Sequence, residues 1–121
     1  MRGFIAPASG CTVARSSKAI IARFRLTDVN GQPAYAPFQA GLAADHDVRV
    51  TLRGPGITAV TVNCGWNASQ ADLTCAIRIP SGVRTGSSQR YTLTATENVG
   101  TGFVTIPAVR GTANPEVIHF R

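Results

Sequence analysis

The chain has 121 residues and a formal net charge of +6, and arginine accounts for all but one of its twelve basic residues. A single domain over residues 1–121 fits this length, and it can bury about two thirds of its unfolded surface. No stretch approaches the ~20 apolar residues of a membrane-spanning helix, which excludes a span of that kind. The excess of arginine favours an anionic partner. Charges scattered in this way, however, more often belong to an ordinary solvated surface.

Short segments in which apolar and polar residues alternate recur along the chain, as expected of half-buried strands. The clearest is Ala19–Thr27, and turn signals such as Asn30-Gly31 separate the segments. No run keeps the spacing of about 3.6 residues that an amphipathic helix needs. Residues 32–47 are therefore expected to form a short strand at 34–35 and then a loop. The expected strands are 3–7, 19–27, 34–35, 48–53, 60–64, 73–79, 90–97, 103–106 and 116–121. This pattern predicts an all-β sandwich without a helix.

Two alternating runs around a polar loop, residues 60–79, each carry one cysteine. Cys64 and Cys75 both lie on the apolar side of their strands. If these strands pair antiparallel, the two Cα atoms approach the ~5.5 Å that a disulfide needs. We therefore expect a Cys64–Cys75 disulfide, with reduced core cysteines or a bridge from Cys11 as alternatives.

The third cysteine, Cys11, stays unpaired in this scheme. A leftover thiol in a secreted protein can link two subunits, so Cys11 is a candidate for an intermolecular bridge. We expect no metal site. Zinc needs about four closely spaced ligands, which the cysteines and histidines do not provide. Asp45-His46-Asp47 is the only dense group of ligand residues, and we interpret it as a solvated loop because calcium needs about six to eight oxygens.

A candidate basic face consists of arginines at outward positions of predicted strands. These are Arg23, Arg25, Arg49, Arg53 and Arg78. The face forms only if their strands lie in one sheet. Nucleic-acid binding would add exposed aromatic side chains for stacking, and none is interleaved with these arginines.

We expect no enzymatic activity, no cofactor and no small-molecule substrate. The sequence has no Gly-x-Ser-x-Gly motif, phosphate-binding loop or dinucleotide motif. His119 is predicted to be structural, and Trp66 to cap the end of the core. Binding is instead expected to use surfaces, with a protein partner or a second copy pairing at the sheet edges Gly3–Ala6 or Glu116–Arg121.

Gly3–Pro7 and Ala19–Gly31 resemble the opening of bacterial immunoglobulin-like modules of the PxKF type, which occur in secreted and surface proteins. Ala22-Arg23-Phe24 stands where that family has a Lys-Phe pair, and an isoleucine replaces the family's proline. Arg90–Thr96 is similar to the late strand of many bacterial immunoglobulin-like repeats. The resemblance covers about a third of the chain. It implies a non-enzymatic spacer or adhesion module and transfers no binding residues.

These observations together predict an immunoglobulin-like β-sandwich of about seven to nine strands. The expected role is a non-enzymatic structural or interaction module of a secreted, cell-surface or filament protein, outside the cytoplasm. The alternative is a phage or virion accessory protein, such as a capsid decoration or tail component. Met1–Pro7 lacks the apolar core of a signal peptide, so export would need a leader removed earlier or another route.

Overall fold

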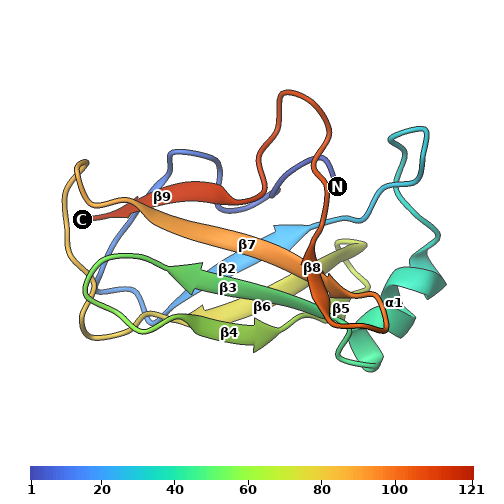
Figure 1. The fold of residues 1–121 in the computed structure, drawn as a ribbon, viewed down its shortest axis with the longest axis horizontal. Coiled ribbons are helices and arrows are strands. Elements are labelled where there is room, and N and C mark those ends of the chain that lie inside the picture. Colours follow the sequence, from blue (N-terminus) through green and yellow to red (C-terminus); the bar gives the residue numbers. More distant parts are fainter.

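The computed structural model describes every residue from Met1 to Arg121. It contains nine strands and one helix: β1 (Thr12–Val13), β2 (Ala19–Phe24), α1 (Ala36–Ala44), β3 (Val48–Arg53), β4 (Val60–Asn63), β5 (Gly65–Asn67), β6 (Asp72–Arg78), β7 (Tyr91–Asn98), β8 (Phe103–Thr105) and β9 (Glu116–Phe120). Figure 1 shows the longer strands running along one axis, with the chain ends toward opposite ends of that axis. The single helix is neither long nor apolar enough to cross a membrane.

The strands form two sheets, which confirms the predicted all-β sandwich. The larger sheet has the order β1-β9-β7-β3-β4, and β8 also pairs with β7. Its pairs are antiparallel except for β1, which runs parallel to β9. The smaller sheet has the order β2-β6-β5 and is antiparallel throughout. An isolated bridge from Ala6 to Arg23 adds the N-terminal segment to the free edge of β2.

The core lies between the two sheets and follows from the alternation along each strand. Fully buried side chains come from both sheets, among them Phe24 and Ile77 from the smaller sheet and Leu52, Leu93 and Ile118 from the larger one. Trp66 packs, half-buried, against this core. Removing one such large buried side chain typically costs about 2–5 kcal/mol of stability, so this layer holds the fold together.

The helix α1 was not expected, and the strand predicted at 34–35 is absent. Pro37 is tolerated because it stands in the first turn, where its missing N–H is not needed. Only Gln39 and Ala43 of the helix are buried, so the sequence contains no apolar stripe that would indicate a helix here. A polar side chain anchors it instead. Gln39 Oε1 accepts the Leu26 N–H at 2.9 Å, and its Nε2 donates to Ala34 O at 2.8 Å. Hydrophobic periodicity does not detect such an anchor.

Two further strand predictions are wrong in their pairing. The segment 60–64 was expected beside 73–79, but β4 pairs with β3 in the larger sheet, and the short β5 from the predicted polar loop pairs with β6. The predicted edge Glu116–Arg121 is not an edge, because β9 lies between β1 and β7. Sequence alternation gives the inward face of a strand but not its neighbours.

Candidate interaction surface

The five arginines of the predicted basic face do not share a sheet. Arg23 and Arg78 lie in β2 and β6 of the smaller sheet, and Arg25 follows β2. Arg49 and Arg53 belong to β3 of the larger sheet. In a sandwich the outer faces of the two sheets point in opposite directions. A single basic ladder through all five is therefore wrong.

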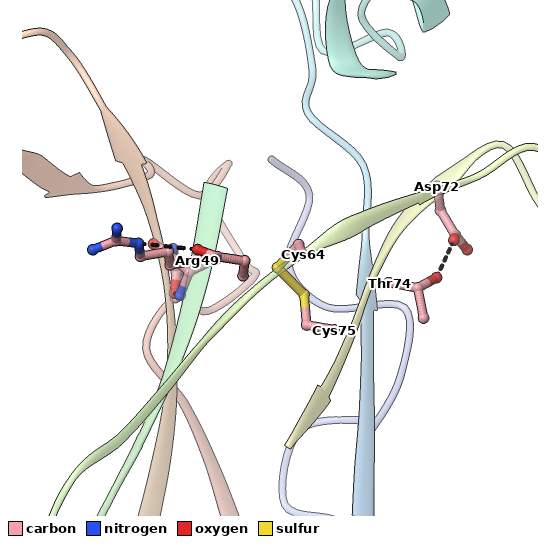
Figure 2. The surroundings of a disulfide bond; sticks show 8 residues. Arg49, Cys64, Asp72, Thr74 and Cys75 are labelled. Carbon is pink, nitrogen blue, oxygen red and sulfur yellow. Dashed lines mark hydrogen bonds between the residues drawn. A yellow bond between two sulfur atoms is a disulfide. The ribbon is translucent and has the colours of Figure 1, made fainter. Parts of the chain in front are cut away.

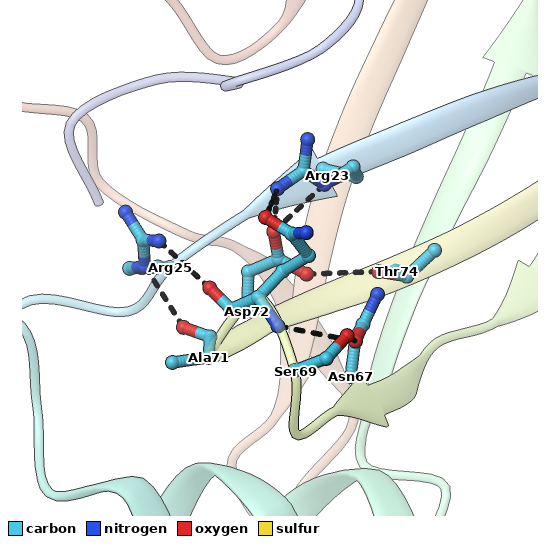
Figure 3. A network of polar contacts seen from close by, with 8 residues as sticks. Arg23, Arg25, Asn67, Ser69, Ala71, Asp72 and Thr74 are labelled. Carbon is cyan, nitrogen blue, oxygen red and sulfur yellow. Dashed lines mark hydrogen bonds and ion pairs between the residues drawn. The ribbon is translucent and has the colours of Figure 1, made fainter.

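Two of these arginines instead fasten the turn between β5 and β6 (Figure 3). Arg23 Nε donates to Oδ2 of the fully buried Asp72 at 2.7 Å, and the two side chains form an ion pair. Thr74 Oγ1 donates to the other Asp72 oxygen at 2.9 Å. Arg25 donates to the Ala71 and Gln70 carbonyl oxygens, both at 2.8 Å. A buried carboxylate needs such partners, so the primary role of this network is to stabilise the fold and not to bind a ligand.

Arg49 also has an internal role. Its guanidinium lies 3.9 Å from the ring centroid of Phe103, and its Nε donates to Asn63 Oδ1 at 3.2 Å. These contacts tie β3 to β8 and β4 across the outer face of the larger sheet. Cation–π contacts of this kind contribute about 0.5–1 kcal/mol at exposed sites.

Seven other basic residues lie in segments that meet at one end of the sandwich, the left of Figure 1, where β3, β6 and β9 end and β7 begins. We call this the basic end, and it consists of Arg15, Lys18, Arg53, Arg78, Arg84, Arg90 and Arg121. Direct contacts join its segments. Arg15 N–H donates to Arg121 O at 2.8 Å, Ile79 N–H donates to Lys18 O at 3.4 Å, and Arg53 pairs with Thr92.

No acidic residue lies at the basic end. Asp28 and Glu97 line a hollow at the opposite end of the sandwich. Asp45 and Asp47 follow α1, and Asp72 begins β6 at that same end. The remaining acidic residue, Glu116, is buried. The net charge of the protein is therefore concentrated at one end, where like charges raise the local potential and attract anions.

A polar hollow of about 440 Å³ opens at the basic end. Its lining residues include Thr12, Thr85, Ser87, His119 and Arg121, whose side chains carry hydroxyl, imidazole and guanidinium groups. The parallel pairing of β1 with β9 brings Thr12 beside His119, and a bridge from Thr85 to Phe120 brings the 85–87 segment to the same strand. Hydroxyl, imidazole and guanidinium groups are the donors that bind oxyanions.

His119 is held in one orientation in this hollow. Its Nδ1 lies 3.0 Å from Gln89 O. A carbonyl oxygen only accepts, so Nδ1 carries the hydrogen and Nε2 is the ring nitrogen left for a ligand. The predicted structural role of His119 thus concerns Nδ1, whereas Nε2 has no hydrogen-bond partner in the protein.

An apolar hollow of about 510 Å³ lies at the opposite end. Its lining includes the exposed side chains of Val29, Phe38 and Val109 above the buried Leu26 and Ile106. Grouped exposed apolar side chains mark contact sites for other proteins. Local sequence patterns do not indicate this hollow, because its lining residues come from five separate parts of the chain: Met1, 26–29, 34–38, Glu97 and 106–109.

The predicted disulfide Cys64–Cys75 is present (Figure 2), with a Cα–Cα distance of 4.4 Å. It continues the β5–β6 register, in which Gly65 is paired with Thr74. Cys11 has a free, partly exposed thiol beside β1. Its neighbour Thr12 lines the polar hollow, so the third cysteine lies near the basic end.

Glu116 is an ionisable group that the sequence did not single out. It is 2% exposed, and its Oε2 has no hydrogen-bond partner. Burial raises the pKa of its carboxyl from 4.5 to about 7. Alternation could have revealed it, since Glu116 shares the inward phase of Ile118 and Phe120.

No protein-family model matches this chain, and no significant match to it was found among curated proteins or solved structures. The function must therefore be inferred from the surfaces described above.

Proposed function

We propose that this chain is a non-enzymatic interaction module with an immunoglobulin-like fold, and that it attaches to an anionic surface through the basic end. It would act as part of a secreted, cell-surface or filament protein. The observation that carries this proposal is the separation of charge, with seven basic residues and no acidic residue at one end of the sandwich.

Several features support the immunoglobulin-like part of the proposal. The two sheets have the neighbour relations of that fold, with β2, β6 and β5 in one layer and β3, β7 and β9 in the other. Tyr91 begins β7, and its hydroxyl accepts the Arg84 N–H at 2.7 Å, as in the tyrosine corner of immunoglobulin domains. The disulfide fits an oxidising compartment. Ala22-Arg23-Phe24, the residues of the PxKF resemblance, lie in β2.

Among anionic partners, a carboxylated or sulfated polysaccharide fits the polar hollow better than a nucleic acid. Bases bind single-strand sites by stacking on exposed aromatic rings. The only aromatic residue in the lining is Phe120, which is buried. Hydroxyl and guanidinium groups suit the sulfate, carboxylate and hydroxyl groups of a polysaccharide.

The test is binding of heparin and of a polygalacturonate by calorimetry, with single-stranded DNA as the comparison. Arg90→Glu removes a cation at the basic end, and Arg110→Glu makes the same change in net charge near the other end. We expect Arg90→Glu to weaken polysaccharide binding about fivefold or more, and about 1 M salt to abolish it. Equal losses in the two variants would mean that only net charge matters. Tighter binding to DNA would overturn the choice of polysaccharide.

The apolar hollow favours the alternative role, a virion accessory protein. Such a protein must dock on another protein, and Val29, Phe38 and Val109 offer an apolar contact at the end away from the basic residues. Phe38→Ser should then prevent attachment to purified capsids or tails while Arg90→Glu leaves it unchanged. The reverse result would favour the surface module.

A further inference from the structure

The strand β4 is the outermost strand on one side of the larger sheet. It pairs with β3 in the register Arg49–Asn63, Val50–Val62, Thr51–Thr61 and Leu52–Val60. Figure 1 shows it at the lower margin of the sandwich, with no strand of this sheet beyond it. Its second edge is therefore open.

The register identifies which backbone groups face that open edge. Cys64 N–H donates to Val48 O at 3.0 Å, so Cys64 and Val48 form a hydrogen-bonded pair. Such pairs alternate along an antiparallel ladder, which makes Val62 and Val60 the next residues bonded to β3. The N–H and C=O groups of Thr61 and Asn63 consequently point away from the sheet. None of them has a partner among the backbone bonds outside the ladder.

This edge has none of the features that usually prevent pairing. It contains no charged residue and no proline, and its sequence Val-Thr-Val-Asn is rich in β-branched residues. The other sheet edges differ. β1 has only two residues, α1 packs against β5, and the N-terminal segment ends at Pro7. β4 is the longest strand whose second edge has no backbone bridge, because the free edge of the longer β2 is bridged to Ala6 at Arg23.

We propose that β4 pairs antiparallel with β4 of a second copy around a two-fold axis at Val62, so that the larger sheet continues across both subunits. Thr61 of each copy then exchanges two backbone hydrogen bonds with Asn63 of the other, which gives about four bonds. The contact involves no residue of the basic end, so the proposed dimer can be tested independently of the proposed function.

The side chains of the new rows are compatible with this pairing. On the outer face the row becomes Arg49, Asn63, then Thr61 and Thr51 of the second copy. Within each copy Thr51 Oγ1 and Thr61 Oγ1 are already 2.8 Å apart, and Arg49 is bonded to Asn63. Across the sheet the two Arg49 residues lie three strand spacings apart, roughly 14 Å, which alone exceeds the Debye length of about 10 Å at 0.1 M salt. On the inner face the half-buried Val62 meets its own copy.

The test uses Cys11→Ser protein, so that no thiol can link subunits. Sedimentation should show a mass that rises with concentration from 12.7 kDa to twice that value, with little dependence on salt. Thr61→Pro should remain monomeric, because proline removes the outward N–H and leaves the bonds of Val60 and Val62 to β3 in place. Thr61→Val keeps the N–H and should still dimerise.

Hydrogen exchange provides a second measurement that needs no variant. The Thr61 and Asn63 amides should become protected as the protein concentration rises, whereas the Val62 amide should be protected throughout. A monomer at all concentrations, or a dimer in which the Thr61 and Asn63 amides still exchange quickly, would overturn the proposal. Protection only when another protein is added would mean that a different chain uses this edge.

Discussion

Cys64 connects both sheets, because its N–H donates to Val48 O in β3 of the larger sheet and its sulfur is bonded to Cys75 in β6 of the smaller sheet. The chain crosses from one layer to the other at this residue, between β4 and β5. The disulfide therefore fixes the crossing point and closes a short loop that includes β5.

Removing the disulfide should destabilise the sandwich. For a loop with a sequence separation of 11, the chain-entropy model gives about 3 kcal/mol. The double variant Cys64→Ala/Cys75→Ala should show this loss in urea unfolding, and Cys11→Ser is the control that should change little. An unfolding midpoint equal to that of the parent would contradict a structural role of the bond.

Gly54 is required by its contact with Tyr91. A β carbon at residue 54 would lie 2.3 Å from Tyr91 Cδ1. The ring cannot move easily, since its hydroxyl is bonded to Pro55 O and to Arg84 N–H and its ring packs in a T-shaped contact with Phe120, with 4.9 Å between centroids.

Gly54→Ala should accordingly cost about 1–3 kcal/mol, the usual range for overpacking. Gly41→Ala is the matched control, because nothing lies within 4 Å of its added carbon and alanine favours the helix α1. Thermal unfolding should move in opposite directions for the two variants. Equal stability of both variants would show that the Tyr91 ring can adapt.

Glu116 should make stability depend on pH. Its pKa is about 7 in the folded protein and 4.5 without burial, so the folded state binds the proton more tightly. Its protonated form is the one that tolerates burial, and stability should fall as the pH rises from about 4.5 to about 7 and then level off. The change is roughly 3 kcal/mol at most, at about 1.4 kcal/mol for each pKa unit.

Glu116→Gln should flatten this part of the pH profile and should be more stable than the parent at pH values above 7. Urea unfolding between about pH 4 and 8 measures both effects. An unchanged slope in the variant would assign the pH dependence to other groups.

The sequence predicted the parts of this fold that depend on local alternation. Ala19–Phe24 and Tyr91–Asn98 are strands in which alternate side chains are buried, as their alternation predicts, and the Cys64–Cys75 bond forms. The predicted reason for the bond was incomplete, however. Period-2 alternation places both sulfur atoms inward, but it does not show that the strand of Cys64 changes sheets at that residue.

The candidate site was less accessible to prediction. Arg15, Arg84 and Arg121 are far apart in the sequence, and their segments come together only because β1 and Thr85 both pair in parallel with β9. The earlier grouping of arginines used the outward phase of strands, which separates inside from outside but not one end from the other. The helix α1 was not predicted because Gln39, and not an apolar stripe, attaches it to the core.

Arg49 and Arg53 provide the sharpest test of the basic end, since both lie on β3 and both sit at outward positions of the strand. Four residues of strand separate them by roughly 13 Å along the sheet. Arg53 is exposed, lies at the basic end and makes no side-chain hydrogen bond, while Arg49 contacts Phe103 and Asn63 near the other end.

Arg53→Glu should therefore weaken heparin binding about fivefold with the melting temperature nearly unchanged, because exposed substitutions usually stay within about 0.5 kcal/mol. Arg49→Glu should do the opposite, leaving binding within about twofold and lowering stability by about 0.5–1 kcal/mol through loss of the cation–π contact. Calorimetric titration and thermal unfolding of the same two proteins measure both quantities. If the two reversals weaken binding equally, the anionic partner lies along the whole outer face of the larger sheet and not at its basic end.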